Sequence, residues 1–170
     1  MKSETEEIII YVENLEILTN EELNRRINKD TWSVLECLKH LNLYGDFYLD
    51  EIHKKMNQNF EKSSEFFHSG FLGNYFAKSM LPKQKLNKMK TFKSMDPIHS
   101  NLTRDVIKEF LEQQSKMLDL LKIARSKDLE KTKTSISISK WIKLKLGDVF
   151  KIVIYHNIRH IQQIKNILNY

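Results

Sequence analysis

Apolar residues recur every three or four positions along most of the chain, and this spacing decides the fold class. It matches the α-helix, in which residues three and four apart share one face, rather than the alternating period of a β-strand. Residues that interrupt helices are also scarce, because the 170 residues include only four glycines and two prolines. The sequence therefore predicts an all-α fold.

The length and composition fit one domain. A chain of 170 residues with 41% hydrophobic content can bury a core, and we expect residues 1–170 to form a single domain. The first twenty residues mix acids with a short apolar run and match neither a signal peptide nor a membrane span, so we expect a soluble cytoplasmic protein. Cys37 is the only cysteine, which excludes an intrachain disulfide and a thiolate-rich zinc site. Any metal must therefore be held by nitrogen and oxygen.

Four long segments have helical periodicity, and one of them carries a clear start signal. Ser33 and Glu36 form an S-x-x-E capping box, in which each side chain satisfies the other residue's backbone N–H. Gly45, inside that helix, disfavours it by about 1 kcal/mol relative to alanine, which suggests tight packing against a neighbour or room for something else. A short helix begins at a Thr19 or Asn20 cap. The long helices are expected at residues 4–18, 33–56, 101–125 and 146–168.

The connections between these helices predict the topology. Residues 57–100 form a long crossover that glycines and prolines interrupt, with one short helical stretch at residues 74–80. Residues 132–146 alternate in character, which indicates an extended connection with at most one hairpin and no large sheet. Short connections join antiparallel neighbours, whereas a long one lets the next helix run parallel, so we expect an up-down-down-up four-helix bundle.

Two histidines lie four residues apart on the last helix. His156 and His160 share a stripe that is otherwise mostly apolar. Their spacing places both side chains on one face about 6 Å apart, which suits two ligands of one metal ion. Buried imidazoles need partners for their polar nitrogens, and a metal ion meets this need. Nearby side chains or water would meet it as well, so the pair alone leaves both interpretations open.

A metal site needs a third ligand, since three protein ligands with one open position are usual in catalytic zinc sites. His40 is the natural candidate, because it lies two turns into the capped helix beside leucines, and that helix would pack against the last one. The other histidines, His53, His68 and His99, lie in charged or loop segments. We expect these three to face solvent.

Several polar residues near the candidate ligands have two interpretations each. Glu36 lies one turn before His40 and could orient its ring, although the capping box alone explains this residue. Gln162 and Gln163 either bond to the free ring nitrogens of the ligands or line the helix surface. No spacing singles out one proton-transfer group among Tyr44, Glu36, Asp46 and His99.

Two stretches resemble the DinB-like superfamily, which includes the bacillithiol-transferase-like proteins. The stretch "TWSVLECLKHL" is similar to the family's W-S-x-x-E-x-x-x-H helix start, and "LKLGDVFKIVIYHNIRHIQQI" is similar to its L-G-(D/E)…H-x-x-R-H-x-x-Q closing helix. Their order, spacing and position match over effectively the whole chain. Lys145 departs from the pattern, because such sequences often have a helix-capping threonine at this position.

The resemblance implies a four-helix bundle with a long crossover and a divalent metal ion on three histidines. By position these ligands are His40, His156 and His160. The implied ion is nickel or zinc, with iron and manganese as alternatives. The sequence identifies no pocket for a thiol cofactor, so the substrate stays open.

Three hypotheses about function follow. The first is a metal-dependent enzyme that activates a water or a low-molecular-weight thiol for hydrolysis or thiol transfer on a small-molecule substrate. The second is a non-enzymatic metal-binding scaffold or a homodimer that pairs through an apolar face, with Trp32 and Trp141 as candidate contacts. The third is nucleic-acid binding, which has only the net charge of +6 in its favour.

The positive charge is unevenly spread along the chain. Residues 66–95 contain no acid, and we call this segment the lysine-rich crossover. A nucleic-acid arm would be more convincing with arginines and with stacking aromatics interleaved among the basic residues, so solubilising lysines explain the segment better and we expect no nucleic-acid partner. The sequence does not place this segment relative to the histidines. Its lysines are Lys78, Lys83, Lys85, Lys88, Lys90 and Lys93.

Overall fold

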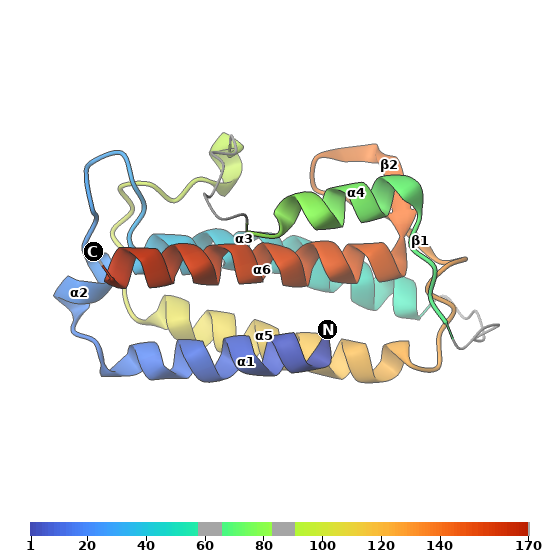
Figure 1. Cartoon of the computed structure of the whole chain (residues 1–170), viewed down its shortest axis with the longest axis horizontal. Coiled ribbons are helices and arrows are strands. Elements are labelled where there is room, and N and C mark those ends of the chain that lie inside the picture. The colour runs from blue at the N-terminus through green and yellow to red at the C-terminus, as the bar shows by residue number, and fades with distance from the viewer. Residues whose placement is uncertain (58–65, 83–90, 170) are drawn as a thin grey trace.

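Four long helices pack side by side along the length of the molecule (Figure 1). The structure is a computed structural model that describes residues 1–57, 66–82 and 91–169. The long helices are α1 (Lys2–Glu13), α3 (Val34–Met56), α5 (Asp105–Ala124) and α6 (Leu146–Leu168). Helices α1 and α3 each contact both α5 and α6, and α1 and α6 run opposite to α3 and α5 in Figure 1. The predicted, mainly helical class is confirmed.

Shorter elements fill the connections. They include a 3₁₀ turn directly after α1, a short helix and 3₁₀ turn in the long crossover, and one antiparallel hairpin where the sequence predicted an extended segment. Within the described residues, no helix is long and apolar enough to cross a membrane. The short elements are η1 (Asn14–Ile17), α2 (Asn20–Asn24), α4 (Phe71–Met80), η2 (Lys93–Met95), β1 (Lys133–Ile136) and β2 (Ser139–Lys145).

Local sequence signals set the starts of α2 and α3. Thr19 and Glu22 form a capping box on α2. On α3, Ser33 Oγ accepts from the Glu36 N–H at 3.2 Å, and Glu36 Oε2 accepts from the Ser33 N–H at 2.8 Å. Each box satisfies backbone donors that have no partner inside the helix. The predicted capping box of the histidine-bearing helix α3 is thus confirmed.

Helix α4 begins at Phe71, three residues before the predicted stretch. The Gly70 N–H donates to Asp148 Oδ2 in the first turn of α6 at 2.9 Å. A Cβ atom at Gly73 would overlap the same carboxylate, so the two helices approach closely there. The sequence prediction fell short because this contact with a distant part of the chain leaves no local signal.

Helix α5 begins at Asp105, four residues after the predicted start. Just before it, the Arg104 guanidinium donates to Asn20 Oδ1 and to the Glu16 carbonyl oxygen, both at 2.8 Å. These bonds fasten the chain to the connection between α1 and α2. The start of α5 is therefore set by tertiary contacts rather than by a capping side chain.

The start of α6 has no capping side chain, because the residue before it is Lys145. Its ammonium group instead donates to Glu130 Oε2 and to the His68 carbonyl oxygen, both at 2.8 Å. Lys145, which stands where similar sequences often have a threonine, therefore ties the start of α6 to two neighbouring segments. Helix α6 still covers the predicted range, residues 146–168.

Gly45 lies on the face of α3 that packs against α5. A Cβ atom at this position would overlap the side-chain amide of Gln113 on α5. That amide donates to the Asn42 carbonyl oxygen at 3.1 Å and to Asp46 Oδ1 at 2.8 Å. Of the two explanations that the sequence offered for this glycine, tight packing against a neighbouring helix is the one observed.

Two apolar clusters fill the interior, and polar side chains separate them. One cluster joins α1 to the first half of α3 and the last turns of α6, around Leu35 and Ile164. The other joins the second half of α3 to α4, the hairpin and the first turns of α6, around Ile52 and Phe150. We call the buried polar residues between the two clusters the polar band. It contains His40, Asn42, Gln113, Gln114, Asn157 and His160.

Candidate metal centre

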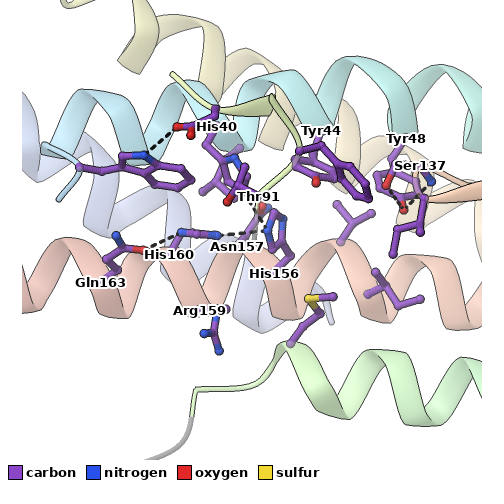
Figure 2. A pocket seen from close by; sticks show the side chains of 18 of the residues that line it. His40, Tyr44, Tyr48, Thr91, Ser137, His156, Asn157, Arg159, His160 and Gln163 are labelled. Carbon is purple, nitrogen blue, oxygen red and sulfur yellow. Dashed lines mark hydrogen bonds between the residues drawn. The ribbon is translucent and has the colours of Figure 1, made fainter. Parts of the chain in front are cut away.

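Three histidines from two helices meet at the polar band, where His156 lies beside its members His40 and His160 (Figure 2). His40 Nε2 lies 3.2 Å from His156 Nε2, and His160 Nε2 lies 3.1 Å from the same atom. His40 comes from α3, and the other two come from successive turns of α6. The i,i+4 spacing on α6 therefore places both rings on the face that meets α3, and the sequence-predicted residues are brought together.

The far side of two of these rings is held by carbonyl oxygens. His40 Nδ1 lies 2.6 Å from the Met95 carbonyl oxygen in η2, and His160 Nδ1 lies 2.9 Å from Gln163 Oε1. A carbonyl oxygen only accepts, so both Nδ1 atoms carry the proton. In a neutral imidazole, Nε2 is then an unprotonated acceptor. His40 and His160 therefore both present lone pairs to the centre of the cluster.

This arrangement leaves acceptors facing one another. Even if His156 carries its proton on Nε2, that single N–H cannot satisfy two acceptor nitrogens with good geometry. A buried acceptor without a donor costs about 1–3 kcal/mol. A cation placed among the three nitrogens would satisfy all of them, and three imidazoles are a normal ligand set for zinc, nickel and related ions. The residues present therefore fit a divalent metal ion.

The electrostatic surroundings keep the three rings neutral. Burial lowers the pKa of His40 to about 4 and that of His156 to about 3. Burial, followed by the neighbouring His156 and His40, holds the pKa of His160 well below its usual value. All three are thus unprotonated at pH 7 and free to act as ligands.

Aromatic rings enclose the cluster from two sides. The Trp32 ring lies 4.6 Å from the His40 ring and 5.7 Å from the His160 ring, measured between centroids. Its indole N–H donates to Asp96 Oδ1 at 3.0 Å, which fixes its orientation. On the other side, the Tyr44 ring lies 4.8 Å from His156 and 4.9 Å from His40. These walls limit how water reaches the nitrogens.

A cavity of about 630 Å³ opens over the cluster. Its volume lies in the range of small-molecule sites, about 300–1,000 Å³. The lysine-rich crossover forms part of its wall through Phe76, Met80, Thr91 and Phe92. Among the described lysines of that segment, Lys78 and Lys93 are exposed and do not line the cavity. The other four lie at positions 83, 85, 88 and 90, outside the described residues.

The structure distinguishes between the two interpretations given for each of the polar residues Glu36, Gln162 and Gln163. Glu36 accepts two bonds from the Arg26 guanidinium, at 2.6 and 2.8 Å, in addition to capping α3. Burial raises its pKa, but the Arg26 guanidinium and the Ser33 N–H outweigh burial, so the pKa of Glu36 stays below its usual value. Gln163 bonds to a ligand ring as described above, whereas Gln162 Nε2 donates to Asn166 Oδ1 at 3.0 Å. Both alternatives considered for the two glutamines occur, one for each residue.

The other histidines lie away from the cluster, as predicted. His53, His68 and His99 are exposed. The Met95 carbonyl oxygen had no signal in the sequence, and the Trp32 of the quoted motif was considered only as a dimer contact, whereas its ring packs against His40. Every residue has a backbone carbonyl, so no residue type marks the one that faces a ligand.

Fold and site together define a class: a helical-bundle protein with three inward-facing histidines that could hold a metal ion. Residues 9–164 match the family model of the DinB superfamily, and the chain belongs to that superfamily. The matched range contains all three histidines and both aromatic walls. No curated protein and no solved structure matches the chain significantly.

Proposed function

We propose that the chain is a divalent-metal-dependent enzyme in which His40, His156 and His160 hold nickel or zinc, with iron or manganese as alternatives. The proposal treats residues 1–170 as one domain with an up-down-down-up four-helix bundle. The observation that carries it is the convergence of three Nε2 atoms, two of them kept unprotonated by carbonyl partners. The cavity above them supplies room for a small molecule.

Three neutral ligands leave the +2 charge of a bound ion uncompensated, so it would acidify a water ligand to a pKa of about 7 or deprotonate a thiol. The reaction class is therefore hydrolysis or transfer of a low-molecular-weight thiol onto an electrophile. The chain's own contribution is to hold the His40 and His160 rings in one tautomer and orientation through Met95 and Gln163. Trp32 and Tyr44 restrict the approach of bulk water.

Tyr44 is the best-placed group for donating a proton or a hydrogen bond to a substrate. It alone, among the four proton-transfer candidates, lines the cavity. Glu36 is paired with Arg26, Asp46 accepts from Gln113 at 2.8 Å, and His99 is exposed. Burial raises the pKa of Tyr44, so its hydroxyl keeps its proton at neutral pH.

Elemental analysis tests the metal site. The expected result is one transition-metal ion per chain after exposure to nickel or zinc and removal of loosely bound ions. His156→Ala should lose the ion. His53→Ala, which removes an exposed histidine from α3, is the matched control and should retain it. A folded wild-type chain that binds neither metal would overturn the site.

Turnover separates the enzyme from a scaffold. Metal-loaded protein is offered low-molecular-weight thiols with electrophilic acceptors, and separately esters and amides. Turnover that depends on the metal and is lost in His156→Ala supports the enzyme. Full metal occupancy without any turnover would favour the non-enzymatic scaffold.

The alternative, a scaffold or homodimer, has its own supporting observation. Phe71 on α4 and Trp141 on β2 are each 94% exposed, which is unusual for large aromatic side chains. Trp32, the other contact candidate, instead packs at the metal centre. Sedimentation equilibrium of the wild type and of Trp141→Ser tests dimer formation. A wild-type monomer at all concentrations would exclude the dimer.

A small molecule is the expected partner, and nucleic acid is not. Within the described part of the chain, Arg159 is the only lysine or arginine that lines the cavity. Binding to DNA or RNA should therefore be absent in a gel-shift assay even at low salt, where electrostatic binding is strongest.

A further inference from the structure

The cavity continues well past the three histidines along the groove between α3 and α6. His40, Tyr44 and Tyr48 follow one another at intervals of four residues, so they lie on one face of α3 and span about 12 Å of its axis. The Tyr44 and Tyr48 rings are nearly parallel, with centroids 6.3 Å apart and planes at 14°. In Figure 2, the two tyrosines and Ser137 form a row that leads away from His156.

The other walls of this extension are apolar. They come from α4, from the hairpin and from the turn of α6 that precedes His156. We call this part of the cavity the apolar arm. It is lined by Phe76, Met80, Ile136, Ile138, Ile152 and Val153.

The two hydroxyl groups at the end of the arm, those of Tyr48 and Ser137, are paired with each other. Tyr48 Oη lies 3.0 Å from Ser137 Oγ and accepts from the Ser137 N–H at 3.1 Å. One hydroxyl hydrogen remains beyond these two bonds, so a ligand in the arm meets few polar groups there. The charged residues that line the cavity lie toward its other end, before α3, after η2 and one residue before His160. They are Asp30, Asp96 and Arg159.

We propose that the apolar arm is a binding site for the hydrocarbon part of the substrate. The occupant is an acyl or alkyl chain of several carbons, or an aromatic ring, whose reactive group lies at the histidines. The substrate class is then a neutral ester, amide or electrophile with an apolar tail, rather than a polyanion. This inference rests on the proposed function for the reaction, but the arm itself is testable without turnover.

Binding of a neutral apolar probe, N-phenyl-1-naphthylamine, tests the arm directly. Its fluorescence should rise with saturable, one-site binding to wild-type protein, with or without metal and equally in His156→Ala. Met80→Gln and Ile138→Gln should each weaken binding about fourfold, the factor for losing the burial of one methylene group. Two variants are used because Met80 and Ile138 come from different elements, α4 and the hairpin, and neither is fully buried.

The exposed aromatic residue Phe71 supplies the matched control on the same helix as Met80. It is 94% exposed and does not line the cavity, so Phe71→Gln should leave probe binding unchanged. Equal weakening by Phe71→Gln and Met80→Gln would place the probe on the outer surface and overturn the proposal. Absence of saturable binding to the folded wild type would overturn it as well.

Chain-length dependence tests the arm as a substrate site. For metal-loaded wild type, kcat/KM on p-nitrophenyl acetate, butyrate and octanoate should rise about fourfold per methylene until the arm is filled. Ile138→Gln should flatten this dependence more than it lowers the rate on acetate. Turnover that is independent of chain length would refute the arm while the proposed function stands. Saturable probe binding without turnover on any ester or thiol acceptor would refute the function while the arm stands.

Discussion

In His40 and His160, the tautomer of the imidazole is set by the carbonyl oxygen that accepts a hydrogen bond from Nδ1. Gln163 Oε1 accepts from His160 Nδ1 at 2.9 Å, so it turns Nε2 toward the centre. Without that acceptor, the ring would be free to rotate or to protonate Nε2 instead. Partners of this kind are worth a factor of about 10–100 in metal affinity. A single amide thus contributes to the site by orienting a histidine ring, although it is not itself one of the three candidate ligands.

Gln163→Ala should therefore weaken zinc or nickel binding about 10- to 100-fold, measured by competition with a chromophoric chelator. Gln162→Ala is the control, because Gln162 is the adjacent residue and its side-chain amide bonds to Asn166 on the outside of the helix. Its affinity should match the wild type. Equal affinities in both variants would show that the Gln163 bond does not orient His160.

The ion pair of Arg26 and Glu36 holds the segment before α3 against its first turn. Glu36 is fully buried, whereas the Arg26 side chain is 28% exposed. Removing the arginine leaves a buried carboxylate without this counter-ion, held by the backbone N–H groups of Ser33 and His99. Arg26→Met should lower the free energy of unfolding by about 2–3 kcal/mol, since an unpaired buried charge is costly.

Urea denaturation of the metal-free protein measures this effect. Lys39→Met removes a more exposed pair on the same helix, in which Lys39 and Glu109 are 28% and 35% exposed. That control should cost about 1 kcal/mol or less. If the two substitutions were equally mild, the Arg26 pair would not stabilise the start of α3.

At the scale of whole helices, the sequence predicted those elements whose signals are local. The capping box and apolar stripe of α3 predicted both its bounds and the inward direction of His40, and the stripe of α6 did the same for His156 and His160. The starts of α4 and α5 were misplaced because Asp148 and Arg104 fix them through residues far away in the chain. Local periodicity contains no information about such contacts.

In the candidate site, too, the sequence predicted only the parts that have a local signal. Its three histidines have a periodic signature, and Gln163 lies one turn after His160. The Met95 carbonyl and the apolar arm have none, because they depend on how the crossover and the hairpin fold over the bundle. Sequence reasoning could therefore propose the ligands but not the shape of the space above them.

The close contact of α3 with α5 gives a test at this scale. Alanine normally stabilises a helix by about 1 kcal/mol relative to glycine. At Gly45 the added Cβ would displace the Gln113 amide, which donates to Asn42 and Asp46. Gly45→Ala should therefore lower the free energy of unfolding by about 1–3 kcal/mol, the usual cost of overpacking.

The double variant Gly45→Ala with Gln113→Ala removes the overlap. It should be less destabilised than the sum of the two single variants, by about 1 kcal/mol or more, in urea denaturation. Asp50→Ala, on the exposed face of α3, serves as the control for helix propensity alone. Additive effects of the two single substitutions would show that the close approach is not what excludes a side chain at Gly45.

For the molecule as a whole, the polar band leads us to expect that metal binding would stabilise the fold. The band crosses the interior between two apolar clusters, where buried polar atoms need partners. Some find them within the band, as in the 2.9 Å bond from Asn157 Nδ2 to Gln114 Oε1. The three histidine nitrogens instead face each other. An ion that completes them would bind the folded chain much more strongly than the unfolded chain.

Metal binding should therefore raise the melting temperature in proportion to the logarithm of free metal concentration. At a concentration 100 times the dissociation constant, the expected stabilisation is about 2.7 kcal/mol. Calorimetry in buffered zinc or nickel measures it, and His156→Ala should show no shift. A melting temperature that does not change with metal, despite full occupancy, would contradict a site built by the fold.

Without metal, the same three rings should make the fold sensitive to mild acid. In the unfolded chain a histidine has a pKa of about 6.5. In the folded chain burial lowers the pKa to about 4 for His40 and about 3 for His156. As the pH falls below 6.5, the unfolded state takes up protons that the folded state refuses, so each such histidine lowers the free energy of unfolding by about 1.4 kcal/mol per pH unit. The loss continues until the pH reaches the folded-state pKa values.

Urea denaturation with a chelator present, at pH 7, 6 and 5, measures this slope. His156→Leu removes one proton-linked group and should reduce the slope by about 1.4 kcal/mol per pH unit below pH 6. His53→Leu, an exposed position on the same helix as His40, should leave it unchanged. A wild-type profile that is flat over this range, or one that His156→Leu does not alter, would mean that the buried rings accept protons in the folded state. In that case, the three histidines would not be held as neutral rings in the folded chain, and they would not support a cation site.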